Sequence, residues 1–406
     1  MFEIELAAGI GCGVAEVPRI WNDRRNRLSY QAERGGRLVR GDDLERRVRA
    51  AFEELDRAGL RRTLRAPSGI DFSSNDYLGL ATHPLLKQRM AAAVCEHGCG
   101  STGSRLLRGE RDCFSLIEQR FAEFKGTERA LYFSSGYLAN LAVLTTFPEA
   151  GDVIFSDERN HASLIDGARL SRARRVIFPH NDVAALRRLM GNETGSGQKF
   201  VVAESVFSVD GDFAPLREYG ELCCETGAAL IADEAHAVGI YGERGQGLGD
   251  DVFVSVNTAG KALGVAGAFV TGPEWAIEFL AQRARPFIFS TAPPPAVAAA
   301  LDASLDVIEG EPERRERLIG LASYLRRRLG VPGTSQIIPV VLGSNERAMA
   351  VALELQHQGF DVRAIRPPTV PEGTARLRIS VNVNLSESVM DRFGDRFADA
   401  LCAASL

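Results

Sequence analysis

The sequence lacks a long apolar segment and any surplus of positive charge. No uninterrupted apolar run approaches the length of about 18 residues that a membrane span requires. The formal net charge of −5 offers no positive field for nucleic acid or for an anionic membrane surface. The first residues, MFEIELAAGIGCG, carry acids where a secretory signal carries lysines. We therefore expect a cytoplasmic protein with neither a nucleic-acid partner nor a membrane partner.

Cysteine is too sparse and too irregularly placed for a disulfide framework or a metal site. The chain has seven cysteines in 406 residues, an odd number for a set of paired bridges. Cys95 and Cys99 flank His97, but this spacing is not the CxxC spacing of zinc ligands, and no second half of such a site follows. The sequence therefore predicts no metal.

From Asp71 onward the sequence alternates between short β-branched segments and segments of helical pattern. The β-branched segments are ALYFSS, DVIFSD, RRVIFP, KFVVAESVFS, AALIADEAHA, DVFVSVNT and AGAFVTG, and the helical ones include SGYLANLAVLTTF and HASLIDGARLS. Such alternation is typical of parallel βαβ units that bury both faces of one sheet. We predict the α/β fold class, with a mostly parallel central sheet covered by helices on both faces.

The same pattern divides the chain into three predicted parts. Residues 1–70 are charged and helical, with little strand signal, and form an N-terminal segment. Residues 71–303 form the large α/β domain. Beyond the prolines of STAPPPAVAAAL, a charged segment predicts one long helix from Leu305 to Leu329, followed by QIIPVVLG, another helix and RLRISV. Residues 304–406 are thus expected to form a smaller α+β domain.

Polar residues and glycines follow several of the predicted strands. The residues that follow predicted strands are Ser208, Asp233, His236 and Lys261, together with Gly136 and Tyr137 after the segment LYFSS. Ligands of open α/β sheets bind outside the carboxyl ends of the strands, so these residues should share one edge of the sheet. Taken singly, each residue has an ordinary explanation: Asp233 could cap a helix, His236 could be a buried histidine, and Lys261 could be an exposed loop lysine. Their combination indicates a binding site.

Small residues around two of these positions favour a phosphate-bearing cofactor. The segment VNTAGKALGVAG surrounds Lys261 with small side chains, which lets the backbone approach a ligand. The residues from Ser134 to Tyr137 open a predicted helix, whose N-terminus offers free N–H groups to a phosphate. An acid such as Asp233 set against a lysine suits a cofactor with a pyridinium nitrogen and an aldehyde.

Two glycine-containing segments imitate nucleotide motifs without meeting their requirements. The segment GCGSTG matches GxGxxG, but the helical segment LLKQRMAAAVCEH precedes it where a dinucleotide site requires a strand. Lys261 is followed by alanine instead of serine or threonine, and Ser255 occupies the place of the first glycine of a P-loop. Neither NAD nor a P-loop nucleotide is predicted.

Nine segments together resemble the α-oxoamine synthases, which are pyridoxal-phosphate enzymes of fold type I. These segments are FSSNDYLGL, GSTGSRLLRG, SSGYLAN, NHASLIDG, FPHND, ESVFSVDGD, ADEAHAVG, TAGKALG and IFSTAPPP. The narrower segment AIRPPTVPEGTARLRIS, Ala364 to Ser380, is similar to the oxononanoate branch. That branch condenses L-alanine with a pimeloyl thioester of coenzyme A or acyl carrier protein, with loss of CO2, in biotin biosynthesis. The resemblance also implies a homodimer with its active sites at the subunit interface.

The resemblance implies a role for each matching residue. Lys261 would form the Schiff base with pyridoxal phosphate and serve as the base, and Asp233 would pair with the ring nitrogen. His161 would stack on the ring and His236 would contact the ring hydroxyl region. The remaining cofactor contacts that the resemblance implies are Gly136, Tyr137, Ser208 and Thr258, with Ser290 or Thr291 reaching in from a second subunit. The substrate contacts that it implies are Asn75 and Arg378 for the amino acid, and Arg61, His161, Arg366 and Thr369 for the rest of the bound substrate.

Three other functions fit parts of the sequence. A glycine-using synthase, of the 2-amino-3-ketobutyrate ligase or 5-aminolevulinate synthase type, shares the same general motifs. An aminotransferase shares the lysine and the aspartate, but gives no reason for the segment RPPTVP. A pyridoxal-phosphate fold that has lost catalysis would not need Lys261, Asp233 and His236 together.

Overall fold

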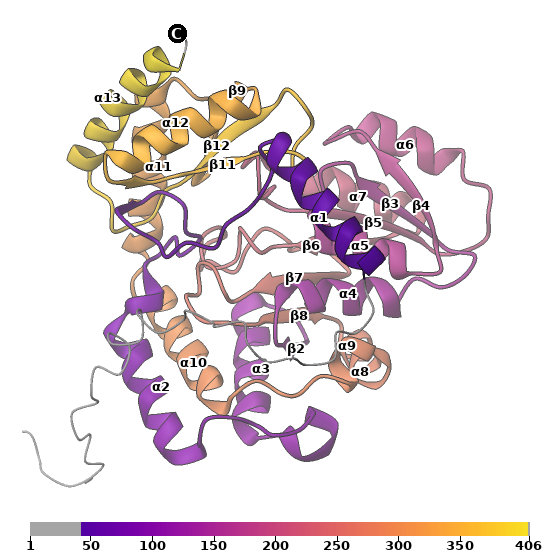
Figure 1. Ribbon diagram of the computed structural model, residues 1–406. Helices are drawn as coiled ribbons and strands as arrows, with labels where there is room; N and C mark the ends of the chain where they lie inside the picture. Colours follow the sequence, from indigo (N-terminus) through magenta and orange to yellow (C-terminus); the bar gives the residue numbers. More distant parts are fainter. Residues whose placement is uncertain (1–41, 405–406) are drawn as a thin grey trace, which may run out of the picture. The chain divides into compact units, whose positions relative to one another are not determined.

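The computed structural model describes residues 42–404, which belong to two compact units, residues 1–63 and 64–406 (Figure 1). The predicted N-terminal segment of residues 1–70 therefore lies largely outside the described residues. In the first unit, helix α1 spans Asp42–Arg57 and exposes four apolar side chains along one face: Leu44, Val48, Phe52 and Leu55. Arg61 lies over the Phe52 ring at 4.6 Å and pairs with Asp56 at 2.7 Å.

The second unit contains most of the helices and all the strands of the described residues. Its helices are α2 (Pro84–His97), α3 (Asp112–Lys125), α4 (Gly136–Thr146), α5 (Ala162–Leu170), α6 (Val183–Gly191), α7 (Leu216–Thr226), α8 (Glu274–Arg283), α9 (Arg285–Ile288), α10 (Pro295–Gly310), α11 (Glu313–Leu329), α12 (Asn345–His357) and α13 (Glu387–Ala403). Its strands are β1 (Ile70–Asp71), β2 (Arg129–Phe133), β3 (Val153–Asp157), β4 (Arg174–Phe178), β5 (Lys199–Glu204), β6 (Ala229–Asp233), β7 (Val254–Thr258), β8 (Ala268–Gly272), β9 (Ile337–Gly343), β10 (Phe360–Asp361), β11 (Arg363–Ile365) and β12 (Ala375–Ser380). Each predicted strand of the α/β region is present.

A seven-stranded sheet forms the centre of this unit, in the order β2-β8-β7-β6-β5-β3-β4. The pairs from β7 through β6, β5 and β3 to β4 are parallel, and β8 is antiparallel to both of its neighbours. Strands in such a sheet are connected by helices that cross over its faces. The predicted fold class, a mostly parallel sheet in an α/β unit, is confirmed.

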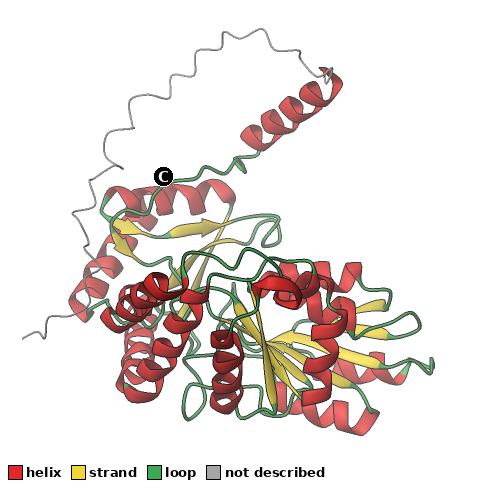
Figure 2. Cartoon of the chain, turned by 90° about the horizontal axis from the view of Figure 1, so that it is seen from below, coloured by secondary structure: helices red, strands yellow, loops and turns green. Residues whose placement is uncertain are grey.

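Both faces of the central sheet are buried by helices, as the views in Figures 1 and 2 show. Along β5, Phe200 and Val202 join a core with residues of α4, α5 and α8, whereas Val201 and Ala203 join a second core with α6 and α7. Alternate side chains of one strand thus enter two different cores. This burial explains why the strand sequences are nearly continuous apolar runs without polar alternation.

The predicted long helix from Leu305 to Leu329 is wrong, because the structure divides this region into α10 and α11. The two helices are separated at Glu311 and Pro312, and Pro312 precedes the first residue of α11. A proline disfavours helical backbone at the residue before it, and Glu311 has φ −126° and ψ 60°. Helix α10 includes residues 303 and 304, and the predicted domain boundary between them stays a prediction.

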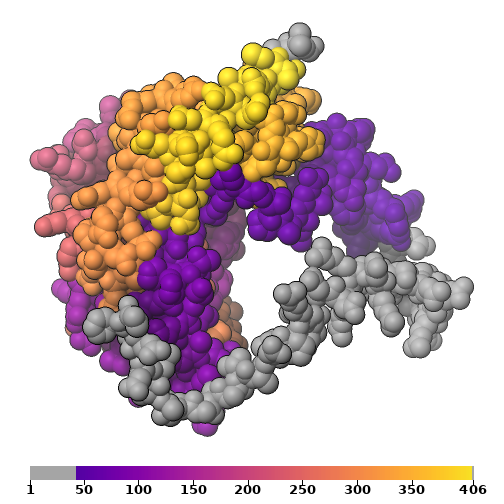
Figure 3. Space-filling view, turned by 90° about the vertical axis from the view of Figure 1, so that its left-hand side faces the viewer, coloured from indigo at the N-terminus to yellow at the C-terminus, as the bar shows by residue number. Residues whose placement is uncertain are grey.

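The C-terminal part contains a three-stranded antiparallel sheet in the order β11-β12-β9. Helix α13 packs against α11 and α12. Figure 3 shows the yellow residues near the C-terminus beside orange residues on one face of the unit. Strand β12 carries Arg376 and Arg378, two residues apart, so both side chains point to the same side of the strand. Among residues 42–404, no helix is both long and apolar enough to cross a membrane. The cytoplasmic location stays a prediction.

Candidate active site

The carboxyl ends of β5, β6 and β7 bring acidic and polar side chains to one edge of the central sheet. Glu204 is in register with Asp233, and Asp233 is in register with Val256. Both carboxylates are buried, with relative exposures of 2% and 5%. Two buried carboxylates on neighbouring strands repel each other and lose hydration, so cationic or proton-donating groups must lie nearby.

Lys261 is held over this edge by the turn that follows β7. The N–H of Ala259 donates to Gly267 O at 2.9 Å, and the N–H of Gly264 donates to Lys261 O at 2.8 Å. Gly264 has φ 69°, and a Cβ at this position would overlap the backbone of Ala81, so glycine is required there. The small residues around Lys261 thus serve a tight turn packed against backbone. The predicted approach of this backbone to a ligand stays a prediction.

A chain of polar contacts runs from Lys261 toward the substrate residues predicted from the sequence. Lys261 Nζ lies 2.8 Å from His236 Nε2, and His236 Nδ1 lies 2.7 Å from the hydroxyl of Tyr77. The Tyr77 hydroxyl donates to Asn75 Oδ1 at 2.9 Å and accepts from Arg378 Nη2 at 3.3 Å. Since the tyrosine proton goes to Asn75, His236 must donate from Nδ1 and accept from Lys261 at Nε2.

The electrostatics of the cluster favour neutral forms of its bases. Burial, together with the charges of Lys261 and Arg378, lowers the pKa of His236 well below its ordinary value, which agrees with a neutral ring. Burial also lowers the pKa of Lys261 to about 8, against the opposing effect of the Asp233 and Glu204 carboxylates. An amine with this pKa is available as a base near neutral pH.

A second chain of contacts joins Asp233 to His161. Asn140 Nδ2 donates to Asp233 Oδ2 at 2.6 Å and to Ser163 Oγ at 2.9 Å. Ser163 Oγ lies 2.7 Å from His161 Nδ1, which also accepts from Ser163 N at 3.2 Å. Loss of hydration lowers the pKa of His161, against the opposing effect of Asp233. His161 is thereby held at the start of α5 with Nδ1 as an acceptor and Nε2 as the protonated nitrogen.

The start of α4 provides an anion-binding element beside these groups. Ser135 caps the helix by accepting from Leu138 N at 3.2 Å. A Cβ on Gly136 would overlap Thr258 Oγ1, so the glycine backbone and this hydroxyl lie against each other. Backbone N–H groups at a helix N-terminus, with a hydroxyl beside them, suit a phosphate. Asn140, which contacts Asp233, lies one helical turn beyond Gly136 on the same side of α4.

Sequence reasoning missed Glu204, Asn140, Ser163 and Tyr77 as members of the site. Glu204 accepts from Ser208 N at 3.0 Å through Oε2, while its buried Oε1 has no hydrogen-bond partner within residues 42–404. Burial and the neighbouring Asp233 raise the pKa of Glu204 to about 8. One signal was available, because Glu204 is an acid that ends the otherwise apolar strand FVVAE.

Arg378 is fixed by three hydrogen bonds at the substrate side of the cluster. Its Nε donates to Ser208 O at 2.5 Å, Nη1 donates to Ser380 Oγ at 2.7 Å, and Nη2 contacts the Tyr77 hydroxyl. An arginine has five N–H donors in a rigid plane, so a guanidinium fixed in this way can still hold a carboxylate. Asn75 reaches the same hydroxyl, and the structure thus brings Asn75, Ser208 and Arg378 together.

Other predicted site residues form contacts outside this hydrogen-bonded cluster. The exposed Tyr137 donates its hydroxyl to Asp166 on α5. Thr291 forms a bridge with Ser104, next to Ser290. Arg61 belongs to the other compact unit, so its predicted substrate contact stays a prediction, as do those of Ser290 and Thr291.

The loop that contains the RPPTVP segment borders a cavity of about 510 Å³. Thr369 lines this cavity together with Pro368, Val370 and Pro371. Arg366 directly follows β11, and its carbonyl accepts from Thr369 N at 3.1 Å. The predicted roles of Arg366 and Thr369 as substrate contacts stay predictions.

The donor set fits pyridoxal phosphate. The α4 N-terminus and the Thr258 hydroxyl suit the phosphate of this cofactor. The Lys261 amine suits its aldehyde, and the Asp233 carboxylate suits its ring nitrogen. The buried, unpartnered Glu204 Oε1 shows that the protein alone does not satisfy every polar group at this edge.

Comparisons with known proteins agree with this reading. The model of the family described as aminotransferase class I and II matches residues 67–397. The chain is 42% identical to an 8-amino-7-oxononanoate synthase of Geobacter sulfurreducens, over 86% of this chain and 96% of that one. It is 45% identical to the enzyme of the same name from Anaeromyxobacter dehalogenans, over 85% of this chain and 93% of that one.

Solved structures of two related kinds match as well. Serine palmitoyltransferase of Sphingomonas wittichii superposes with a TM-score of 0.82 at 31% identity, covering 91% of this chain and 99% of that one. The 8-amino-7-oxononanoate synthase of Francisella tularensis superposes with a TM-score of 0.72 at 29% identity, covering 84% of this chain and 99% of that one. A further serine palmitoyltransferase structure, with a TM-score of 0.82, 29% identity and coverage of 91% and 100%, contains pyridoxal phosphate as its internal aldimine. The chain therefore belongs to the pyridoxal-phosphate-dependent α-oxoamine synthases of fold type I, and within them to the family of 8-amino-7-oxononanoate synthases.

Proposed function

We propose that this protein condenses L-alanine with a pimeloyl thioester, with loss of CO2, to form 8-amino-7-oxononanoate. The observation that carries the proposal is the placement of Lys261, His236 and Asp233 at one sheet edge in a chain of this family. Pyridoxal phosphate, when bound, supplies an aldehyde that links to amines and a ring that accepts the electron pair left on the amino-acid carbon.

Lys261 is the proposed base for the alanine Cα proton. Its pKa of about 8 leaves a useful fraction of neutral amine near neutral pH. The neutral His236 accepts from Lys261 Nζ and thereby orients the amine. Because its pKa lies well below the ordinary value, His236 does not compete with Lys261 for the substrate proton.

Asp233 and His161 are proposed to act on the cofactor ring from two directions. The Asp233 carboxylate would pair with the protonated ring nitrogen, whose positive charge lets the ring accept the electron pair left on the amino-acid carbon in the transition state. The Asn140 hydrogen bond holds one oxygen of this carboxylate in place. His161, fixed through Ser163, is proposed to lie against the ring face and the substrate.

Arg378 is the proposed partner of the alanine carboxylate. Its three hydrogen bonds to Ser208, Ser380 and Tyr77 hold the guanidinium plane before substrate arrives, which reduces the entropy lost on binding. Tyr77 links this plane to His236, so that the amino acid and the base are positioned by one network.

We also propose that the protein works as a homodimer. Phe289 and Leu107 are exposed, by 70% and 83%, and they flank the contact in which Ala292 N donates to Gly103 O. Apolar side chains gathered in this way favour association with a second copy. Sedimentation tests this directly, and a fully active monomer in dilute solution would contradict it.

The function is tested by product analysis. Purified protein with pyridoxal phosphate is incubated with a pimeloyl thioester and either L-alanine or glycine, and products are identified by mass. We expect 8-amino-7-oxononanoate from alanine. Efficient turnover with glycine alone would place the protein with the glycine-using synthases instead.

A further inference from the structure

The 510 Å³ cavity has an apolar wall and a charged wall. Ile165, Phe207 and Val209 contribute to the apolar wall. Arg159 and Asp210 contribute to the charged wall, together with Arg376. A volume of this size falls within the range of about 300–1,000 Å³ that small-molecule sites occupy. Such a wall pattern suits a ligand with a methylene chain and an ionised end.

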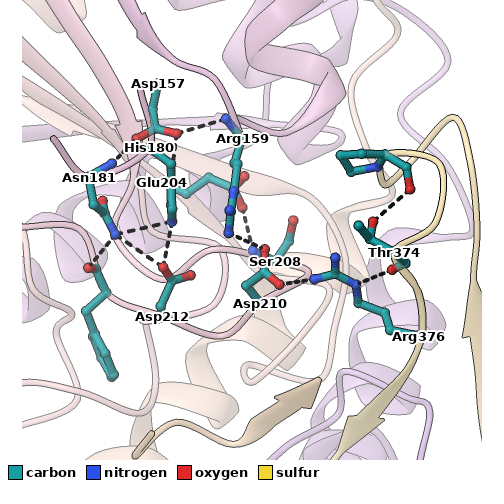
Figure 4. A network of polar contacts seen from close by, with 12 residues as sticks. Asp157, Arg159, His180, Asn181, Glu204, Ser208, Asp210, Asp212, Thr374 and Arg376 are labelled. Atoms are coloured by element: carbon teal, nitrogen blue, oxygen red, sulfur yellow. Dashed lines mark hydrogen bonds and ion pairs between the residues drawn. The ribbon is translucent and has the colours of Figure 1, made fainter. Parts of the chain in front are cut away.

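The charged wall is an ion triplet centred on Asp210. Asp210 Oδ2 accepts from Arg159 Nη1 at 3.0 Å, and Oδ1 accepts from Arg376 Nη1. The Arg376 side chain is 9% exposed, and its Nε also donates to Thr374 O at 3.0 Å, as Figure 4 shows. The Arg159 side chain, by contrast, is 49% exposed. Arg376 thus anchors Asp210, which in turn holds Arg159 at the accessible end.

The triplet carries one positive charge more than negative charge, since two guanidinium groups share one carboxylate. Glu158 also lines the cavity, and solvent and salt screen the charge of this exposed residue. A carboxylate that enters beside Arg159 would balance the triplet and gain charge-assisted hydrogen bonds.

The cavity adjoins the catalytic cluster because three chain segments contribute to both. In each segment, one residue belongs to the cluster and another, two positions away, belongs to the ion triplet. These pairs are His161 with Arg159, Ser208 with Asp210, and Arg378 with Arg376. Two Cα atoms that are two positions apart lie at most roughly 7 Å from each other, whatever the local conformation. A short acyl chain that reacts beside Lys261 can therefore reach the triplet with its far end.

We propose that Arg159, tethered by Asp210, binds the terminal carboxylate of the acyl chain and selects thioesters of dicarboxylic acids over those that end in a methyl group. The inference rests on the proposed function, since it names the part of the same active site that recognises the acyl tail. The methylene groups of the tail would lie along Phe207, Ile165 and Val209. Arg376 is already enclosed and bonded, so Arg159 is the guanidinium that the tail meets.

The test compares two acyl chains of equal length in wild type and Arg159→Gln. The holoenzyme is assayed with L-alanine and either pimeloyl-CoA or heptanoyl-CoA, which has the same seven carbons and ends in a methyl group. We expect Arg159→Gln to lower kcat/KM for pimeloyl-CoA by roughly 10- to 100-fold, as for a lost charge-assisted hydrogen bond. The value for heptanoyl-CoA should stay within about twofold, because apolar burial is unchanged.

Two further variants separate charge recognition from general effects. Arg159→Lys keeps the charge and should restore part of the preference for pimeloyl-CoA. Arg187→Gln removes an arginine of similar exposure, 55%, that also pairs with a carboxylate, Glu225, and should leave both thioesters unaffected. The proposal would be overturned if Arg159→Gln lowered kcat/KM equally for both thioesters, or if this variant kept the wild-type preference for pimeloyl-CoA over heptanoyl-CoA.

Binding of the free acids gives a readout that does not depend on turnover. Calorimetry with the holoenzyme should show that wild type binds pimelate more tightly than heptanoate, and that Arg159→Gln loses this difference. If wild type makes no product from pimeloyl-CoA, the proposed function fails, yet the calorimetric comparison still decides the role of Arg159. If wild type makes the product but Arg159→Gln keeps the pimelate preference, the inference fails and the function stands.

Discussion

The amine of Lys261 lies 2.8 Å from Nε2 of His236, a neutral and buried imidazole. Because the other ring nitrogen contacts Tyr77, the imidazole is fixed from both sides and presents an acceptor to the lysine. The pair therefore combines a mobile amine with a rigid orienting group. This arrangement explains how one lysine can first hold the cofactor and then serve as a base.

Replacement of Lys261 by alanine should separate cofactor binding from covalent attachment. The α4 N-terminus, Thr258 and Asp233 remain, so Lys261→Ala should still bind pyridoxal phosphate, while turnover falls by at least about 10³-fold because the base is lost. Mass spectrometry after borohydride reduction tests for the covalent adduct, which wild type should form and the variant should lack. Substantial remaining activity in the variant would refute the assignment.

The reactivity of Lys261 toward the cofactor should follow its lowered pKa. Attack on the aldehyde requires the neutral amine, and burial lowers the pKa of Lys261 to about 8. The rate of cofactor uptake by the apoprotein should therefore rise about tenfold per pH unit below pH 8 and level off above it. Stopped-flow absorbance measures this rate. A rise that continued to the ordinary lysine range near 10.5 would show that the amine is not desolvated.

Removal of the Asp233 charge should affect catalysis more than cofactor affinity. Asp233→Asn keeps the shape of the side chain, but removes the counter-charge that matters most when the substrate carbanion forms. We expect exchange of the alanine Cα proton to slow by on the order of 10²-fold or more, with a much smaller change in cofactor Kd. Proton exchange is measured by NMR in deuterated buffer, and an unchanged exchange rate would contradict the role.

Glu204 should make the stability of the apoprotein depend on pH. Burial raises its pKa to about 8 from an ordinary 4.5, so the folded state holds the proton more tightly than the unfolded state. The resulting stabilisation is present below about pH 4.5 and is lost as pH rises toward 8. Glu204→Gln does not titrate, so the free energy of unfolding of this variant should rise relative to that of wild type by roughly 4 kcal/mol between pH 5 and pH 8.5. Denaturant curves at both pH values measure this, and a constant difference would show that Glu204 is ionised in the fold.

Local patterns were sufficient to predict the strands and the sheet edge at which the candidate site residues lie. The segments ALIAD and VSVNT are apolar because both faces of their strands are buried, and the edge rule then places Asp233 and Lys261 together. The break between α10 and α11 could also have been predicted from the sequence, since Pro312 disfavours helical backbone at Glu311. The prediction of one helix followed the charge pattern and gave the proline too little weight.

Other members of the site depend on contacts between distant segments. Asn140 reaches Asp233 across 93 positions, and Tyr77 reaches His236 across 159. Neither partner follows from the spacing within its own segment, because the crossover helices and the sheet order determine which side chains meet. The Arg159–Asp210–Arg376 triplet likewise joins three separate segments, so only the folded chain reveals it.

In the proposed reaction, the protein removes the carboxyl group of alanine only when it joins the remaining carbon to a pimeloyl group. Release of CO2 from L-alanine radiolabelled at its carboxyl carbon tests this most directly. We expect release that requires both pyridoxal phosphate and the pimeloyl thioester, that matches the thioester consumed mole for mole, and that disappears in Lys261→Ala. Release without thioester, or thioester consumption without labelled CO2, would contradict the account.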